Sequence, residues 1–112
     1  MKSRTKLFAL RVIKVFKNLP KEEEAQIIGK QLLRSATSVG ANYRAACRAR
    51  SDAEYFSKMC IVVEEVDESA YWMELLIEAE TIPATRLESL LNETNELLAI
   101  FASSRKTLKE KR

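Results

Sequence analysis

Basic side chains at helical spacing are the groups in this sequence whose types and positions could serve binding chemistry. Four of them fall along one side of a single long helical segment: Lys30, Arg34, Arg44 and Arg48. Positive groups at such a pitch contact phosphates without reading bases, which gives sequence-independent and salt-sensitive binding. The candidate nucleic-acid-binding residues are Lys30, Arg44, Arg48 and Arg50, with a merely solvated position as the equal alternative for the three arginines. No aromatic platform accompanies them, which disfavours specific recognition of single strands.

Arg34 has different surroundings from the other basic residues of this stripe. Small and apolar residues follow it directly, and an acid-rich segment comes later in the chain. We expect Arg34 to be partly buried and to form a structural ion pair with one of those acids, such as Glu65 or Glu68. An exposed Arg34 would instead join the phosphate-binding candidates.

The residues on which most enzymes rely are missing or badly placed. The sequence has no histidine, which removes the usual general base and the histidine-containing metal motifs of helical bundles. Neighbouring acids such as Glu64 and Glu65 point in different directions on a helix. Ser35 and Ser38 have no base at a suitable spacing. The sequence therefore predicts no enzyme, no catalytic residue, no metal site and no cofactor.

The two cysteines, Cys47 and Cys60, fall inside predicted helices and lack the spacing of metal ligands. We expect them to be reduced and packed thiols rather than a disulfide. No apolar run approaches the roughly 20 residues that a membrane-spanning helix needs. A cytoplasmic protein without a membrane partner is the resulting expectation.

Hydrophobic periodicity divides the chain into four predicted helices, which begin near residues 3, 20, 51 and 83. Pro20 and Pro83 suit a first helical turn, and Ser51 with Glu54 forms a capping-box pattern. Connections this short make neighbouring helices antiparallel. The expected fold is all-α, an antiparallel up-down-up-down four-helix bundle in which residues 1–112 form a single domain.

One face of each predicted helix is apolar and is expected to form the core. In the first two helices these residues are Phe8, Val12, Val15, Phe16, Leu19, Ile28, Leu32, Ser35, Ala36, Val39, Tyr43 and Cys47. In the last two they are Tyr55, Met59, Val62, Val63, Val66, Ala70, Met73, Ile77, Leu87, Leu90, Leu91, Thr94, Leu98 and Phe101. Gly29 and Gly40 lie inside the second helix, where a glycine costs about 1 kcal/mol, so we expect a neighbouring helix to approach closely there.

Charge is segregated between the predicted helices. Residues 1–20 carry six Lys or Arg and no acid, whereas residues 52–80 carry nine acids and one lysine. Apolar residues interrupt the charged outer faces of both segments. Either the bundle buries more than one face of the third helix, or the cationic helix of one copy docks on the anionic helix of the next. The interface residues of the second alternative are Leu7, Leu10, Ile13, Lys14, Lys17, Ile61, Glu65, Glu68, Trp72 and Leu75.

Several short motifs follow one another in a characteristic order: Leu19-Pro20, Gln31 to Ala36 with Ser38 and Asn42, Lys58 to Glu65, and Glu68 to Trp72 with Leu75. From Phe8 to about Phe101 this order and spacing resemble the bacterial 23S rRNA intervening-sequence protein family. Many relatives have an Asn-aliphatic-x-Glu-Gly sequence where this chain reads Asn-Tyr-Arg-Ala-Ala at residues 42–46. The chain therefore resembles an arginine-richer branch of that family.

The resemblance implies an antiparallel four-helix bundle that assembles as a homopentameric ring. The chain is similar also to the accessory proteins of diversity-generating retroelements, which are basic pentamers that engage a reverse transcriptase and nucleic acid. The expected function is that of a nucleic-acid-associated accessory factor, for RNA or DNA. The alternative is a protein-binding scaffold without nucleic-acid contact, whose charges serve assembly alone.

Overall fold

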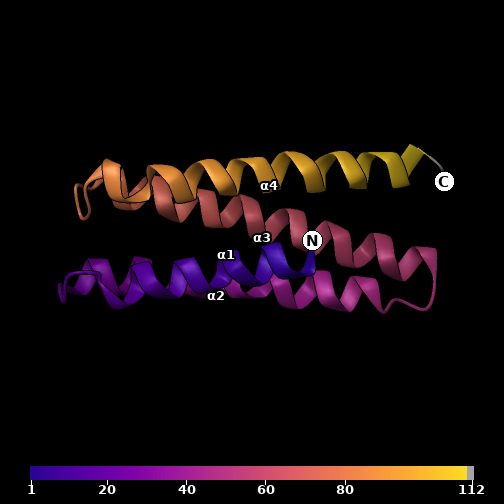
Figure 1. Ribbon diagram of the computed structural model, residues 1–112, viewed down its shortest axis with the longest axis horizontal. Helices are drawn as coiled ribbons and strands as arrows, with labels where there is room; N and C mark the ends of the chain where they lie inside the picture. The colour runs from indigo at the N-terminus through magenta and orange to yellow at the C-terminus, as the bar shows by residue number, and fades with distance from the viewer. Residues whose placement is uncertain (111–112) are drawn as a thin grey trace.

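Four helices make up the secondary structure of the computed structural model, which describes residues 1–110 (Figure 1). They are α1 (Lys2–Lys17), α2 (Glu23–Cys47), α3 (Asp52–Glu78) and α4 (Ala84–Glu110). Consecutive helices run in opposite directions, and no strand occurs in the described residues. The predicted all-α, antiparallel up-down-up-down four-helix bundle is confirmed.

The start of α3 follows the predicted capping box. The Oγ of Ser51 accepts a hydrogen bond from the backbone N–H of Glu54 at 3.1 Å. The carboxylate of Glu54 in turn accepts one from the backbone N–H of Arg50 at 3.2 Å. The N–H of Glu54, which the first turn of the helix leaves unpaired, and the N–H of Arg50, just before the N-cap, are thus both satisfied at the reversal between α2 and α3.

The start of α2 differs from the prediction, because the helix begins at Glu23 and not at Pro20. Glu22 has an extended backbone with φ −61° and ψ 147°. The side-chain amide of Gln26 donates to the carbonyl of Pro20 at 2.8 Å, which holds this carbonyl outside the helical ladder. Pro20 therefore belongs to the connection after α1.

A Schellman motif ends α3. The backbone N–H of Thr81 donates to the carbonyl of Leu76 at 3.0 Å, and that of Glu80 donates to the carbonyl of Ile77 at 3.0 Å. Glu80 adopts the left-handed conformation with φ 58°, which this motif requires at its position. The chain then reaches Pro83, directly before the first residue of α4.

The seam between α2 and α3 is the most extensive helix contact of the bundle. Helix α4 packs on α3, α1 packs on α2, and the contact between α1 and α4 is the smallest of the four. The molecule is elongated, with extents of 46 × 21 × 20 Å. Within residues 1–110, no helix is both long enough and apolar enough to cross a membrane.

Helix α1 is much shorter than the other three helices. It has 16 residues, against 25 in α2 and 27 each in α3 and α4. Its N-terminus consequently lies partway along the bundle, whereas the last turns of α4 lie at one end (Figure 1). Toward the end of the bundle at which α2 leads into α3, α1 is therefore absent. Only the end of α2, the start of α3 and the end of α4 are present there.

The core agrees with the predicted apolar faces at most positions. Residues expected and found buried include Phe8, Val12, Leu32, Val39, Met59, Val62, Val66, Met73, Leu87 and Phe101. The prediction was wrong for Cys47, which is exposed. The neighbouring residue Ala46 is buried and occupies the core position instead. One residue is a 100° step on a helix, so an error of one position moves a side chain from the core edge to solvent. Cys60, the other free cysteine, is half-buried.

Further small errors of the same kind occur along the other helices. The expected core residues that are only partly buried are Val15, Phe16, Ile28, Tyr43, Tyr55, Ile77, Leu91 and Leu98. Leu76 and Leu97 are buried beside Ile77 and Leu98, because the core face is shifted by one position there. The partly buried side chains still pack against the core and form its rim.

Both glycines of α2 face α1 or the residues that follow it, but the predicted close approach is found only at Gly29. A Cβ on Gly29 would overlap the side chain of Leu19 and lie 3.1 Å from Cδ1 of Phe16. A Cβ on Gly40 would lie 3.6 Å from Oγ1 of Thr5, an ordinary van der Waals distance. Only Gly29 is therefore required by packing.

This difference predicts opposite effects of two alanine substitutions. Gly40→Ala should raise the free energy of unfolding by up to about 1 kcal/mol, because alanine is the better helix former and has room. Gly29→Ala should lower it, because overpacking against the buried Leu19 costs about 1–3 kcal/mol and exceeds the helical gain. Urea denaturation followed by circular dichroism measures both values. Equal stabilisation by the two substitutions would contradict the close approach at Gly29.

Candidate nucleic-acid interface

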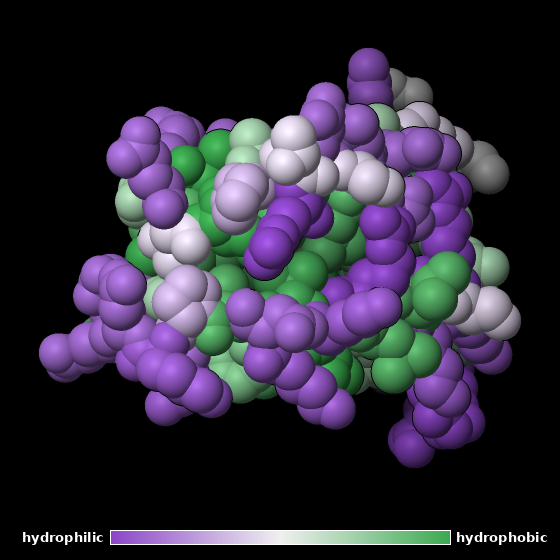
Figure 2. Space-filling model, turned by 60° about the vertical axis from the view of Figure 1, so that its left-hand side comes forward, coloured by the Kyte–Doolittle hydropathy of each residue, from purple (hydrophilic) through white to green (hydrophobic). Residues whose placement is uncertain are grey.

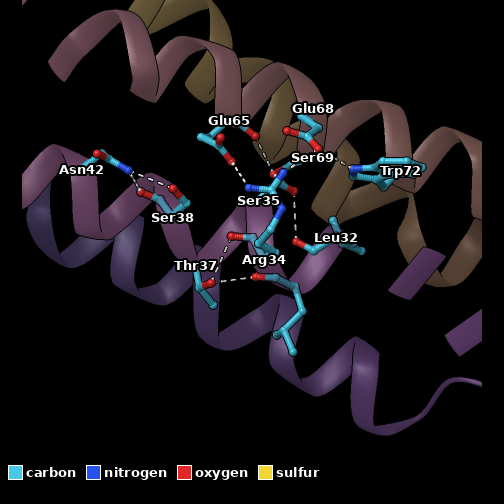
Figure 3. A network of polar contacts seen from close by, with 11 residues as sticks. Leu32, Arg34, Ser35, Thr37, Ser38, Asn42, Glu65, Glu68, Ser69 and Trp72 are labelled. Atoms are coloured by element: carbon cyan, nitrogen blue, oxygen red, sulfur yellow. Dashed lines mark hydrogen bonds and ion pairs between the residues drawn. The ribbon is translucent and has the colours of Figure 1, made fainter. Parts of the chain in front are cut away.

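A polar network joins α2 to α3 on one side of their seam (Figure 3). Arg34 forms ion pairs with Glu68 at 2.6 Å and with Glu65 at 3.3 Å. The side chain of Arg34 is 51% exposed, so the partial burial that we expected for it is wrong. The short residues around Arg34 let α2 approach α3, and the long arginine side chain extends from that seam into solvent.

The two glutamates of this network have different electrostatic environments. The hydrogen bond from Arg34 holds the pKa of Glu68 below its ordinary value, and the indole N–H of Trp72 also donates to Glu68, at 3.1 Å. Burial raises the pKa of Glu65, although the charge of Arg34 opposes this effect. Beneath them, the hydroxyl of Ser69 donates to that of Ser35 at 3.0 Å, which links the two helices inside the core.

A second polar contact fastens α1 to α4. Arg4 forms ion pairs with Glu93 and Glu96, both at 2.8 Å. The hydrogen bond from Arg4 lowers the pKa of Glu93 below its ordinary value. Arg11, two turns further along the same face of α1, donates to the hydroxyl of Ser89 at 3.1 Å. Arg4 is thus occupied within the chain and is not available to an outside anion.

A groove of about 530 Å³ lies between the start of α1 and the second half of α2. We call it the basic groove; its lining residues are Lys2, Ser3, Thr5, Lys6, Ala9, Thr37, Gly40, Ala41, Arg44 and Arg48. The cations among them are exposed, and none forms an ion pair within the described residues. No acid of residues 1–110 lines the groove. It therefore presents four unneutralised positive charges to solvent.

The backbone adds to the positive potential of the basic groove. Helix α1 begins at its rim, and the first turn of α1 contains no acid. In the described part of the chain, Met1 provides no side-chain cap for the N–H groups of that turn. These N–H groups carry the positive end of the helix dipole, which favours anions. The small residues Ala9, Gly40 and Ala41 leave the groove open to close approach.

The four predicted nucleic-acid-binding residues occupy different places. Arg44 and Arg48 line the basic groove. Lys30 is exposed but lies about 20 Å away along α2, because each helical residue advances by about 1.5 Å. Arg50 is exposed in the connection between α2 and α3. The structure thus brings two of the four together and separates Lys30 from them.

Lys2 and Lys6 of the basic groove were missed by the sequence reasoning, which considered the cations of α1 only as an interface. They lie four residues apart on α1, as Arg44 and the C-cap residue Arg48 do at the end of α2. This matched spacing on two antiparallel helices was visible in the sequence. The packing of Thr5 against Gly40, which brings the two pairs of cations side by side, could not be read from the sequence.

The predicted interface residues of α1 lie largely on its outer surface. Leu7 and Leu10 are 57% and 56% exposed, and Ile13 is half-buried. Lys14 and Lys17 are exposed beside them. Figure 2 shows apolar surface among charged side chains on one face of the molecule.

Two of the predicted interface residues of α3 have partners within the chain. Glu65 and Glu68 form ion pairs with Arg34, as the sequence analysis expected for one of them. Ile61, Trp72 and Leu75 are only half-buried. The exposed side chains that the prediction did not include are Glu64, Asp67, Tyr71 and Glu74.

The long axis of the bundle separates the free cations from many of the acids. We call the end where α2 leads into α3 and where α4 finishes the basic end. Its exposed or half-exposed cations include Arg44, Arg48, Arg50, Arg105, Lys106 and Lys109, beside two exposed acids, Asp52 and Glu54. Lys2 and Lys6, at the start of α1, lie nearer the middle of the bundle. At the opposite end lie Glu22, Glu23, Glu24, Glu78 and Glu80, together with Lys17 and Lys21.

The fold and the basic groove define a small four-helix-bundle protein with a cationic surface at one end. Residues 1–103 match the family model described as 23S rRNA-intervening sequence protein, and the chain belongs to that family. A crystal structure of a protein of unknown function from the S23 ribosomal protein family of Bacteroides thetaiotaomicron is similar over 94% of this chain and 97% of that one. The two share 38% sequence identity with a TM-score of 0.87. No curated protein matches the sequence.

The exposure of Arg34 predicts a modest and pH-dependent contribution to stability. Arg34→Ala should lower the free energy of unfolding at pH 7 by about 1 kcal/mol, the size typical of an exposed ion pair. The lowered pKa of Glu68 stabilises the folded state above the ordinary glutamate pKa of about 4.3, and this contribution disappears as the pH falls through the folded pKa. The loss should therefore be smaller at pH 3, as measured by thermal denaturation.

Arg86→Ala is the matched control for this measurement. Arg86 is an exposed arginine that forms no ion pair in the described residues. Its substitution should change stability little at either pH. A loss from Arg34→Ala that is as large at pH 3 as at pH 7 would show that packing, not charge pairing, accounts for it.

Proposed function

We propose that this protein is a non-enzymatic, homo-oligomeric accessory factor that binds the phosphate backbone of nucleic acid through its basic groove. The observation that carries the proposal is the convergence of Lys2, Lys6, Arg44 and Arg48 in a groove with no acidic lining residue among those described. The absence of histidine from the sequence and of any three-residue metal-ligating cluster within residues 1–110 is consistent with a binding role.

The chemistry of the basic groove fits phosphates better than other anions of a protein surface. Two pairs of cations on antiparallel helices neutralise several charges at once, and each neutralised phosphate releases condensed counterions. The hydroxyls of Ser3 and Thr37 and the open N–H groups of α1 supply further donors. These contacts do not distinguish bases, so binding should be largely independent of sequence.

The family name supports an association with RNA, and the resemblance to retroelement accessory proteins adds DNA and a reverse transcriptase as candidate partners. A scaffold that binds only proteins is the alternative function. The exposed apolar side chains of Leu7, Leu10 and Tyr71 favour this alternative, because protein–protein interfaces bury such side chains.

Binding of a fluorescein-labelled RNA duplex, measured by anisotropy at several salt concentrations, tests the proposal. Affinity should fall steeply with salt, by about 0.9 logarithmic units per phosphate contact for each tenfold rise in salt. Arg44→Ala combined with Arg48→Ala should weaken binding and reduce this slope by about 2.

Lys21→Ala combined with Arg86→Ala removes the same charge far from the basic groove. Both residues are exposed, and neither lines the groove. This control should leave the slope nearly unchanged. If the wild-type protein binds no nucleic acid even at low salt, the scaffold function replaces the proposal.

The second part of the proposal is self-association through the outer faces of α1 and α3. The α1 face combines exposed Leu7 and Leu10 with Lys14 and Lys17. The α3 face combines exposed Tyr71 with acids that have no ion-pair partner in the described residues: Glu64, Asp67 and Glu74. Because the two faces differ and are complementary, copies would join head to tail and close into a ring, for which the resemblance implies five subunits.

Reversing the charge of one face should weaken this assembly. Lys14→Glu combined with Lys17→Glu would place like charges opposite each other. The variant oligomer should therefore dissociate at a higher protein concentration than the wild type does. Sedimentation velocity between about 1 and 100 µM measures the change, and the control is Lys21→Glu with Arg86→Glu. A wild-type protein that stays monomeric across this range rules out the ring.

A further inference from the structure

Gly40 lies in the interior of α2, where a glycine destabilises a helix relative to alanine. Its backbone does not use the conformational freedom of glycine, because neither glycine of the chain has a positive φ. A Cβ at this position would make ordinary van der Waals contacts with Thr5, so packing does not require a glycine either. Gly29 differs in this respect, because the side chains of Leu19 and Phe16 occupy the space beside it. Neither conformation nor helix packing accounts for Gly40.

The place of Gly40 in the basic groove supplies an explanation. Gly40 lines this groove together with Ala9 and Ala41, whose side chains are single methyl groups. We call these three residues the groove floor, because their side chains end close to the helix backbone whereas those of the lining cations extend outward. A ligand can approach the backbone of a helix closely only where the side chains are this small. The groove floor therefore leaves room for a ligand between α1 and α2.

Cations border the basic groove from two helices. Lys2 and Lys6 belong to α1, and Arg44 and Arg48 belong to the end of α2. A second groove, of about 600 Å³, lies between the first turns of α3 and the last turns of α4. Its three lining cations all come from α4, and no acid among residues 1–110 lines it. Of these two grooves, only the basic groove can hold an anionic chain between cations of two helices.

The lining of the basic groove suits a sugar–phosphate backbone and offers no platform for a base. No aromatic residue of the described chain lines it, so a base would find no ring on which to stack. Its polar groups are the four cations and the hydroxyls of Ser3, Thr5 and Thr37. Such groups make most of the contacts to phosphate and sugar in protein complexes with nucleic acid.

From these observations we infer that the sugar–phosphate backbone of one strand enters the basic groove, with a phosphate lying against Gly40 and Ala41 and the bases directed away from the protein. Cations of α1 and α2 then neutralise neighbouring phosphates from both sides. Gly40 is in this arrangement a ligand-contacting residue, and its missing side chain lets the strand lie between the two helices. The inference rests on the proposed function and adds to it the orientation of the ligand and the surface on which it lies.

The first experiment removes the bases from the ligand. A fluorescein-labelled DNA strand of about 12 nucleotides is compared by anisotropy with a strand of equal length whose central residues are abasic. Both carry the same phosphates, so their affinities should agree within about twofold and their salt slopes should be equal. An intact strand that binds more than about tenfold more tightly than the abasic one would place bases against the protein and overturn the inference.

The second experiment separates a role of Gly40 in binding from a role in folding. Gly40→Ala should stabilise the fold and yet weaken binding of the abasic strand about fivefold, because the added methyl group occupies the groove floor. Asn95→Ala is the matched control: it also replaces a weaker helix former by alanine, at an exposed position of α4 outside both grooves. The control should leave affinity unchanged. Wild-type affinity of Gly40→Ala would contradict contact between the strand and Gly40.

A third experiment fills the groove floor without changing any charge. Ala41 is exposed, so Ala41→Leu does not disturb the core, and leucine is a good helix former. Its larger side chain should weaken binding of the abasic strand about tenfold by keeping the backbone away from α2. Ala99→Leu, at an exposed alanine of α4 that lines neither groove, should bind like the wild type. Circular dichroism verifies that all variants are folded.

The inference and the proposed function fail in different ways. If Arg44→Ala combined with Arg48→Ala weakens binding but Ala41→Leu does not, the cations hold the ligand outside the groove floor and only this inference fails. If the wild-type protein binds neither an RNA duplex nor either strand at low salt, the proposed function fails with it.

Discussion

The close contact of α2 with α3 is the constraint on which the other features of this bundle depend. Small and hydroxyl-bearing side chains occupy that seam, and Ser35 and Ser69 hydrogen-bond to each other within it. Buried hydroxyls are tolerated only when they are paired, and this pair is satisfied between the two helices themselves. Because the seam is narrow, Arg34 reaches across its edge to Glu65 and Glu68. The bulky residues of both helices are directed toward the core instead.

This arrangement also sorts the charges of the molecule. The acids nearest the seam neutralise Arg34, and the acids of α4 neutralise Arg4. Many of the cations that these pairs do not occupy lie where α1 begins and where α2 and α4 end, whereas others, such as Lys17, Lys21 and Arg86, lie toward the opposite end. A short α1 contributes to this result, because its N-terminus stops partway along the bundle and opens toward α2 (Figure 1). Two grooves without acidic lining residues, in the described chain, are the outcome.

The two grooves have different chemistry although they share one end of the bundle. The basic groove offers cations, hydroxyls and helix N–H groups, which are donors for phosphate. The second groove, between the first turns of α3 and the last turns of α4, is lined by three cations, Arg105, Lys106 and Lys109, beside apolar side chains. The exposed apolar residues of α1 and α3 lie outside both grooves and remain available for self-association.

The sequence by itself determined the four helices, their antiparallel order and most of the core, because periodicity, prolines and the Ser51–Glu54 cap act over a few residues. It also identified Arg34 as the partner of Glu65 or Glu68. Only the tertiary structure decided how exposed that pair is, since exposure depends on how closely two helices approach. The same holds for the grooves, whose residues are far apart in the chain. Lys6 of α1 and Arg44 of α2 line one groove, and Cys60 of α3 and Arg105 of α4 line the other. Local patterns specify which face of a helix is polar, but the packing of the core determines which polar faces meet.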